Sequence, residues 1–192
     1  DRSPSRGLGD VYKRQGLNRA DGLTKLDSVL QVLFGKKYDE TDGMFSEHLI
    51  LLASISVSNI KISKILEIGT YDGRTALILS KLFPESSILT IDLPINKKEF
   101  ESTYNRGKKI NSFVINRTTN LDNAPNVELK EINSLGLSLF EEAFDLIWID
   151  GAHGYPVVAM DIINSFRLAS DGGYVLIDDI WKSVKISDKM YK

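Results

Sequence analysis

Residues Lys64–Thr75 read KILEIGTYDGRT, a run of apolar residues with an acid in it, followed by two glycines four positions apart. The apolar run predicts a buried strand, and the helical pattern from Arg74 to Phe83, ended by Pro84, predicts a helix after it. A glycine at the end of a strand lets the chain turn sharply and lets a ligand approach the backbone. The following helix presents N–H groups and a positive dipole end to that ligand. The stretch therefore indicates a nucleotide-like binding turn.

This turn differs from the two usual phosphate-binding loops. The dinucleotide fingerprint G-x-G-x-x-G requires glycines where Tyr71 and Arg74 stand, and a P-loop requires a Gly-Lys-Ser/Thr run that the sequence lacks. What remains is E-x-G-x-x-x-G, in which Glu67 brings a negative charge into the turn. That charge repels a pyrophosphate and suits a cationic ligand. An ordinary strand-to-helix turn without a ligand is the alternative interpretation.

The chain around the turn alternates apolar strands with helical segments. Such alternation predicts an α/β fold, a doubly wound, mostly parallel sheet with helices on both faces and ligands at the carboxyl ends of the strands. The predicted strands are Lys64–Ile68, Ile88–Ile91, Val127–Ile132, Phe144–Ile149 and Tyr174–Ile177. The predicted helices are Phe45–Ile55, Arg74–Phe83, Leu135–Ala143 and Pro156–Ala169, with one more inside the polar stretch Asn96–Asn126.

Asp92 supplies a second signal at the end of a predicted strand. It ends the strand that follows the glycine turn and stands 19 residues after Gly73. An acid at that place accepts hydrogen bonds from both hydroxyl groups of a ribose. A solvated strand end is the alternative interpretation of Asp92 alone.

Taken in order, these motifs resemble the class I S-adenosylmethionine-dependent methyltransferases, over about Met44 to Trp181. In that family the first motif is an E-x-G-x-x-x-G turn and the second strand ends in a ribose-binding acid. The family contacts adenine where INS (Ile132–Ser134) stands, and FDLIWIDGAHGY and GGYVLIDDIW match its fourth and fifth strands. The resemblance implies a Rossmann-like fold and S-adenosylmethionine as cofactor. The implied cofactor-binding residues are Glu67, Gly69, Thr70, Tyr71, Gly73, Thr75, Asp92, Leu93, Asn133, Ser134 and Asp150.

A second group of acids follows the last two predicted strands. Asp150 comes after one strand, and Asp178 with Asp179 comes after the other. Unpaired like charges repel, and an oxygen-only cluster suits a hard divalent ion such as Mg²⁺. The arrangement resembles the catechol-type and macrocin-type O-methyltransferases, which place a metal between an acid after strand four and an acid pair after strand five. Capping, loop ordering or solvation of these three acids, without a metal, is the alternative.

His153 lies three residues after Asp150, where catechol-type enzymes carry a lysine. A histidine with a near-neutral pKa at the rim of a pocket is suited to act as general base for a hydroxyl group. His153 and Asp150 are therefore the predicted catalytic residues. A loop histidine that only hydrogen-bonds to backbone or to the adenine is the other interpretation.

The predicted function is S-adenosylmethionine-dependent methyl transfer to the oxygen of a small hydroxylated molecule, assisted by a divalent ion such as Mg²⁺. The alternatives are a metal-independent methyltransferase, an NAD(P)-dependent oxidoreductase, and an inactive methyltransferase-like domain that binds a nucleoside or a protein. The missing dinucleotide fingerprint argues against the oxidoreductase. The oligomeric state, a homodimer included, stays open.

Composition excludes several other classes. The sequence of 192 residues is 42% hydrophobic, has a formal net charge of −2 and contains no cysteine. Its pI is about 5.8, so it lacks the excess of basic residues that is typical of proteins whose main partner is a nucleic acid or an anionic membrane. No apolar run approaches the roughly 20 residues that span a bilayer. The absence of cysteine fits a reducing compartment, and we expect a cytoplasmic protein.

The two ends of the sequence suggest three segments. SRGLGDVYKRQ (Ser5–Gln15) back-translates into the end of a transposase-type sequencing adapter, so residues 1–15 are predicted to be a disordered scar. Residues 16–43 are then an N-terminal extension, and residues 44–192 are the methyltransferase domain. The family's sheet continues with a helix and two more strands, so we expect a domain truncated after its fifth strand.

Overall fold

The structure, a computed structural model, describes residues 12–41, 47–95 and 110–178. The chain divides into two compact units, Asp1–Ile62 with Lys81–Pro84, and Ser63–Ser80 with Glu85–Lys192. Every candidate site residue belongs to the second unit. None of the helices in the described ranges combines the length and the apolarity that crossing a membrane requires.

The first unit is built on the helices α2 (Arg19–Phe34) and α3 (Glu47–Ser56). The Asn18 side chain caps α2 by accepting from the N–H groups of its first turn. Gly22 lets the helices approach closely, because a Cβ there would lie 2.0 Å from the Ser54 Oγ. The sequence had predicted α3 but not α2, and the predicted start of α3 at Phe45 lies outside the described residues.

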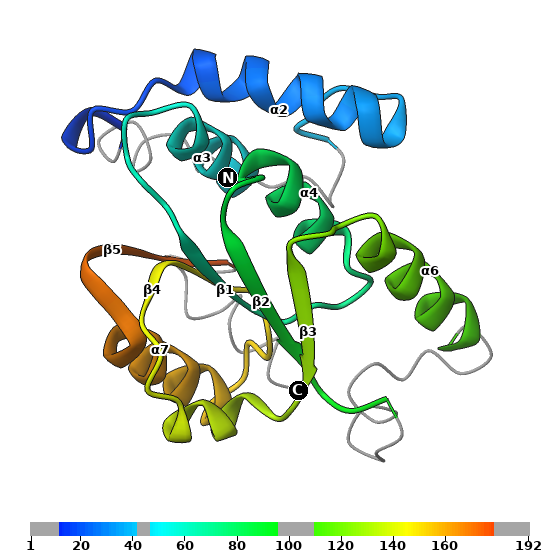
Figure 1. The fold of residues 1–192 in the computed structure, drawn as a ribbon, viewed down its shortest axis with the longest axis vertical. Helices are drawn as coiled ribbons and strands as arrows, with labels where there is room; N and C mark the ends of the chain where they lie inside the picture. Colours follow the sequence, from blue (N-terminus) through cyan, green and yellow to red (C-terminus); the bar gives the residue numbers. More distant parts are fainter. Residues whose placement is uncertain (1–11, 42–46, 96–109, 179–192) are drawn as a thin grey trace. The chain divides into compact units, whose positions relative to one another are not determined.

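The second unit contains a parallel sheet of five strands in the order β3-β2-β1-β4-β5 (Figure 1). This confirms the predicted Rossmann-like sheet. All carboxyl ends of the strands lie at one edge, because every neighbouring pair is parallel. The strands are β1 (Lys64–Ile68), β2 (Ser87–Asp92), β3 (Val127–Glu131), β4 (Phe144–Ile149) and β5 (Ala169–Ile177).

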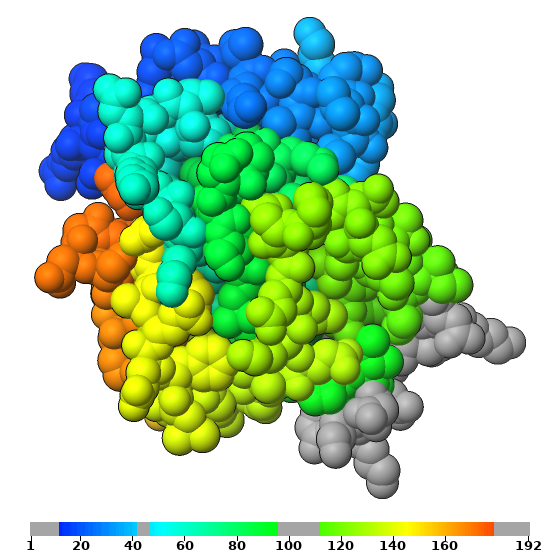
Figure 2. All heavy atoms as spheres, in the orientation of Figure 1, coloured from blue at the N-terminus to red at the C-terminus, as the bar shows by residue number. Residues whose placement is uncertain are grey.

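Helices connect the strands of this sheet. They are α4 (Arg74–Leu82), α6 (Ile110–Asp122), the 3-10 helix η2 (Ser134–Leu139) and α7 (Val157–Leu168), and the last residues of α4 belong to the first unit. Figure 1 shows α6 and α7 on opposite sides of the strands. In the space-filling view, α6 and the strand segments next to it lie directly against one another (Figure 2).

The helix predicted over Leu135–Ala143 is wrong in type and in length, because the segment forms the shorter 3-10 helix η2. Asn133 starts η2 by accepting from Leu135 N, and Phe140 after its end is extended. The guanidinium of Arg167 on α7 donates to the carbonyl oxygens of Leu137 and Phe140. This tertiary contact pairs carbonyls that a longer helix would have used itself.

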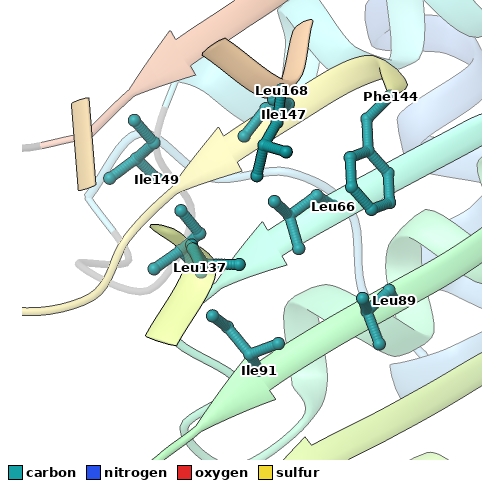
Figure 3. Packing of buried hydrophobic residues seen from close by; sticks show 9 residues of the cluster. Leu66, Leu89, Ile91, Leu137, Phe144, Ile147, Ile149 and Leu168 are labelled. Carbon is teal, nitrogen blue, oxygen red and sulfur yellow. The ribbon is translucent and has the colours of Figure 1, made fainter. Parts of the chain in front are cut away.

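A cluster of buried aliphatic side chains and one phenylalanine joins one face of the sheet to η2 and α7 (Figure 3). Leu66, Leu89 and Ile147 lie side by side on this face, since the register pairs Leu66 with both of the others. Leu137 of η2 and Leu168 of α7 pack against them. Burial of each such side chain contributes about 1.5–3 kcal/mol relative to exposure. The packing holds the strand ends that carry the candidate site in fixed register.

Candidate functional site

The turn after β1 runs along the end of β4. Gly69 has a φ of +103°, and a Cβ there would lie 2.2 Å from the backbone oxygen of Asp150. Gly69 N and Thr70 N both donate to Ile91 O, which binds the turn to β2 as well. Tyr71 has a φ of +50°, unusual for a residue with a side chain. Only glycine fits position 69, so the turn is bare because the end of β4 crosses beside it.

Helix α6 supports the far end of this turn. A Cβ on Gly73, whose φ is +75°, would lie 3.3 Å from each of three α6 atoms. The Asn120 amide donates to Asp72 O at 2.8 Å, and Asp72 Oδ1 accepts from Arg74 N at the start of α4. The sequence analysis did not identify Asn120, because nothing local shows that the helix inside the polar stretch meets the glycine turn.

Glu67 lies under the turn and is fully buried. The register pairs it with Thr90, whose hydroxyl donates to Glu67 Oε2 at 2.5 Å. Because one hydroxyl donates once, the Thr70 hydroxyl supplies the proton in the 2.6 Å contact between Thr70 and Thr90. Burial raises the pKa of Glu67 well above its usual value, and the nearby aspartates add to that shift, although the Thr90 hydrogen bond opposes it. Glu67 Oε1 has no hydrogen-bond partner among the described residues.

Asp92 ends β2 and is almost completely buried. Its Oδ2 accepts from Tyr71 N at 2.8 Å, and its Oδ1 accepts from Leu93 N at 2.7 Å. The first bond ties the glycine turn to the acid. The structure thus brings together the two features from which the sequence predicted a nucleoside site.

Arg117 on α6 is a residue that the sequence analysis missed. Its side chain is 2% exposed and bridges two acids, with Nη1 3.4 Å from Asp92 Oδ2 and Nη2 3.1 Å from Glu131 Oε1. The guanidinium lies 5.9 Å from the centre of the Phe113 ring, which in turn contacts the Tyr71 ring edge to face. Helical spacing puts Phe113 and Arg117 on one face of α6, and that spacing is the only local signal of this contact.

The adenine-side prediction, Asn133 and Ser134, falls at the start of η2. Asn133 is exposed, and Ser134 is half-buried. Asp161 on α7, which was not predicted, is completely buried, and burial raises the pKa of its carboxyl group. Ser134 is near enough to oppose that shift, but no hydrogen bond of ordinary geometry reaches Asp161 from the described residues. Asp161 Oδ2 also lies 3.6 Å from where a Cβ on Gly151 would be.

The predicted metal and catalytic residues lie at the ends of β4 and β5. Asp178 N donates to Ile149 O at 2.9 Å, so Asp150 and Asp178 follow neighbouring strands directly. The His153 Nε2 lies 3.9 Å from Asp150 Oδ1, and both side chains are about one third exposed. Asp179 lies outside the described residues. Within residues 12–41, 47–95 and 110–178, no three acidic or histidine side chains are arranged to hold a metal.

Thr75 and Leu93 complete the predicted set. Thr75 stands in the first turn of α4, and the Leu93 backbone binds Asp92 as described. Apart from Asp179, which lies outside the described residues, and from Asn133 and Ser134 at the start of η2, the predicted residues lie at one edge of the sheet in two groups. The first surrounds the turn after β1 and the end of β2, and the second surrounds the ends of β4 and β5.

Comparison with known proteins adds a family match. Residues 66–180, more than half of the chain, match a family described as "Methyltransferase domain". The match includes every candidate site residue from Glu67 to Asp179. No curated protein matches the sequence.

Three solved structures are similar in fold. A candidate caffeoyl-CoA O-methyltransferase from Staphylococcus aureus has a TM-score of 0.51 at 17% identity, over 96% of this chain and 82% of its own. The S-adenosylhomocysteine-bound methyltransferase PaMTH1 from Podospora anserina has a TM-score of 0.50 at 18% identity, over 99% and 81%. An O-methyltransferase family protein from Burkholderia thailandensis has a TM-score of 0.47 at 16% identity, over 66% of this chain, which spans 36% of that protein. At these identities the first two show the shared fold.

Proposed function

This chain belongs to the methyltransferase-domain family, which confirms the resemblance predicted from its sequence, and we propose that it methylates the oxygen of a small hydroxylated molecule. In this proposal the methyl donor is S-adenosylmethionine, and a divalent ion such as Mg²⁺ assists the reaction. The proposal assigns the turn after β1 and the end of β2 to the cofactor. It assigns the ends of β4 and β5 to the acceptor and the metal ion, and Asp150 there to the cofactor as well.

One observation carries the cofactor assignment, the hydrogen bond from Tyr71 N to Asp92 Oδ2. It joins a turn whose Gly69 leaves no space for a Cβ to an acid at the end of the neighbouring strand. A ribose on Asp92 therefore lies next to backbone that a ligand can approach closely. Glu67 Oε1, which has no hydrogen-bond partner among the described residues, is a further buried polar atom under this turn. These features fit an adenosyl group with a cationic end.

The residues proposed to hold the cofactor divide by the part that they bind. Asp92 and Leu93 are assigned to the ribose, and Asn133 with Ser134 to the adenine. Glu67 and the turn are assigned to the amino-acid end, together with Asp150. The turn residues are Gly69, Thr70, Tyr71, Gly73 and Thr75. When bound, S-adenosylmethionine supplies a methyl group activated on a sulfonium.

His153 is proposed to take the proton from the acceptor hydroxyl. Its side chain is one third exposed at the sheet edge, and Asp150 is near enough to stabilise a charged imidazolium. At 3.9 Å, Nε2 and Asp150 Oδ1 are within ion-pair distance when the imidazole is protonated, but too far apart for a hydrogen bond between these two atoms.

The metal proposal rests on the chemistry of the donors. Asp150 and Asp178 offer carboxylate oxygens from adjacent parallel strands, a donor type that Mg²⁺ prefers. Asp179 is the proposed third donor. Such an ion would neutralise the acids and lower the pKa of a bound hydroxyl group. A metal-independent reaction is the second candidate, because His153 lies 3.9 Å from Asp150 at the same end of β4 and can serve as the base.

The chemical class of the acceptor is also a proposal. The name of one structural neighbour, whose match covers 96% of this chain, contains O-methyltransferase. The net charge of −2 supports a small molecule rather than a nucleic acid.

Calorimetric titration of S-adenosylhomocysteine into the full chain, with and without Mg²⁺, tests the proposal. We expect saturable binding by the wild type and its loss in Asp92→Ala. Asp171→Ala, at an exposed acid of β5, is the matched control and should bind normally. A folded wild type that does not bind would overturn the cofactor assignment. Binding without methyl transfer to any hydroxylated acceptor in a broad panel would instead favour an inactive nucleoside-binding domain.

A further inference from the structure

Arg117 is a buried cation at the ends of β2 and β3. Its side chain is only 2% exposed, whereas most arginine side chains in proteins lie on the surface. Its partners are Asp92, whose side chain is 4% exposed, and Glu131, whose side chain is 41% exposed. A buried guanidinium is stable only when acids and hydrogen bonds compensate it. Arg117 and Asp92 therefore depend on one another.

The sheet register creates the need for this cation. Asp92 and Glu131 are direct partners across the parallel strands β2 and β3. Two carboxylates that end neighbouring strands repel one another unless a positive charge lies between them. Arg117 reaches both from α6, with its two terminal nitrogens on different acids. Without it, repulsion from Glu131 would act directly on the Asp92 carboxylate.

The bonds to Asp92 differ in strength. Tyr71 N and Leu93 N bind its two oxygens at 2.8 and 2.7 Å, whereas Arg117 Nη1 stays 3.4 Å from Oδ2. The backbone bonds set the carboxylate plane, and the longer contact to Arg117 acts mainly through charge. An ionised and oriented carboxylate is the form that accepts two hydroxyl groups of a diol.

The same helix also holds the turn beside Asp92. Phe113 packs against the Tyr71 ring with centroids 5.1 Å apart, and the Asn120 amide donates to Asp72 O. Arg117 lies between Phe113 and Asn120 on α6, at spacings of four and three residues. The helix thus controls both the acid and the turn whose N–H group binds that acid.

We propose that Arg117 is a positioning residue that holds Asp92 ready for the two ribose hydroxyl groups of the adenosyl cofactor. The inference rests on the proposed function, because it takes the adenosyl group as the ligand. It goes further in assigning a role in ribose recognition to a residue that does not touch the proposed ligand. Arg117 acts through Asp92, so its effect should depend on the presence of the ribose hydroxyl groups.

The test measures that dependence by calorimetry. S-adenosylhomocysteine and its 2′,3′-dideoxy analogue are titrated into the wild type, Arg117→Met, Arg117→Lys and Arg167→Met. Arg167, which binds the carbonyls of η2 and is remote from Asp92 in its contacts, is the matched control. Thermal unfolding of each variant is recorded alongside.

We expect Arg117→Met to weaken S-adenosylhomocysteine by about tenfold or more, the range for a hydrogen bond to a charged group, and to change the affinity for the analogue by less than about twofold. Arg117→Lys keeps a positive charge but lacks the forked guanidinium. Its affinity for S-adenosylhomocysteine should lie between those of the wild type and Arg117→Met. It also carries the comparison if the methionine variant does not fold. Arg167→Met should change the affinity for both ligands to the same extent, because both carry the adenine that is assigned to the start of η2.

Three outcomes would overturn the inference. Equal losses for both ligands would mean a general structural role for Arg117, and unchanged binding of both would mean no role. A folded wild type that binds neither ligand would overturn the proposed function itself, and the inference with it. The two failures are therefore distinguishable from the wild-type titration alone.

Discussion

The acids at the two halves of the sheet edge contrast in their surroundings. On the side of β1, β2 and β3, Glu67 and Asp92 are buried, and each is bound by neighbouring hydrogen-bond donors. On the side of β4 and β5, Asp150 is one third exposed, and its Oδ1 lies 3.9 Å from His153 Nε2. Buried acids with fixed partners suit the binding of an invariant cofactor. Accessible acids suit contact with the methyl acceptor.

The two halves are joined by the pairing of β1 with β4, and Gly69 lies at the end of that pairing. Gly69 belongs to the turn of the first half, and the missing Cβ makes space for the backbone oxygen of Asp150 in the second. The contact holds the proposed cofactor turn and the proposed acceptor residues at a fixed separation. Changes at or around this contact should therefore reveal how strongly the two halves depend on one another.

Gly69→Ala should have the largest effect. Its Cβ would collide with Asp150 O at a residue with φ of +103°, so we expect a loss of about 4 kcal/mol or more in the free energy of unfolding, or no folded protein. Gly172→Ala has a positive φ but open space and should lose roughly 1–2 kcal/mol. Gly136→Ala, with open space and no positive φ, should be nearly neutral. Urea unfolding of all three checks this order, and equal losses at Gly69 and Gly172 would contradict the contact between the halves.

His153→Gln tests whether the accessible half carries the chemistry. We expect kcat to fall by about 100-fold or more, the usual contribution of a general base, with unchanged affinity for S-adenosylhomocysteine. His48→Gln changes the only other histidine of the sequence and should keep kcat. The measurement is the rate of S-adenosylhomocysteine formation with an accepted hydroxylated substrate. A His153 variant that retains wild-type kcat would remove His153 from the proposed mechanism.

Asp178→Asn separates the metal from the cofactor. If Asp178 is a ligand, the calorimetric heat of Mg²⁺ binding should disappear while S-adenosylhomocysteine still binds, because the two halves hold different groups. Asp171→Asn, at an exposed position of the same strand, should leave the Mg²⁺ heat intact. A wild type without any Mg²⁺ heat would favour the metal-independent candidate. Loss of cofactor binding in Asp178→Asn would contradict the division into halves.

Asp161→Asn should give the smallest change, in the pH dependence of stability. Burial raises the pKa of Asp161 in the folded chain, so between its unfolded and folded pKa values the unfolded state has released a proton that the folded state keeps. Stability from this group is therefore complete below the unfolded pKa and decreases as pH rises toward the folded pKa. The asparagine variant should show a flatter profile by urea unfolding from pH 4 to 7. The raised pKa of Glu67 makes stability fall with pH in the same way in the wild type and in Asp161→Asn, so it does not affect their difference. Identical pH profiles of the two proteins would contradict the raised pKa of Asp161.

The strands could be predicted because their apolar residues are local. The predicted bounds of β1 and β4 agree with the structure, since both strands are buried almost throughout. The 3-10 form of η2 could not be predicted, because its length depends on Arg167 from a helix later in the chain. Amphipathic spacing predicts that a segment is helical, but the contact that ends it is tertiary.

In the candidate site too, the residues marked by local sequence could be predicted and those that depend on tertiary contacts could not. Asp92 and Gly69 stand at strand ends, where sequence order alone shows their place. Arg117 and Asp161 lie within helices, and their importance depends on which strand end each helix packs against. The roles assigned to individual site residues stay predictions, and so do the predicted scar at residues 1–15 and the truncation.

The sequence by itself determined the fold class, the alternation of strands and helices from β1 onward and the family, because hydrophobic periodicity and glycine at a tight turn are properties of short segments. The tertiary structure decided which charges are paired. It made Glu67 a buried acid of raised pKa, gave Asp92 a cation, and left Asp150 accessible. The physical reason is that burial and Coulomb energy depend on distance in space, and residues 25 positions apart, such as Asp92 and Arg117, become neighbours only when the sheet and α6 have packed.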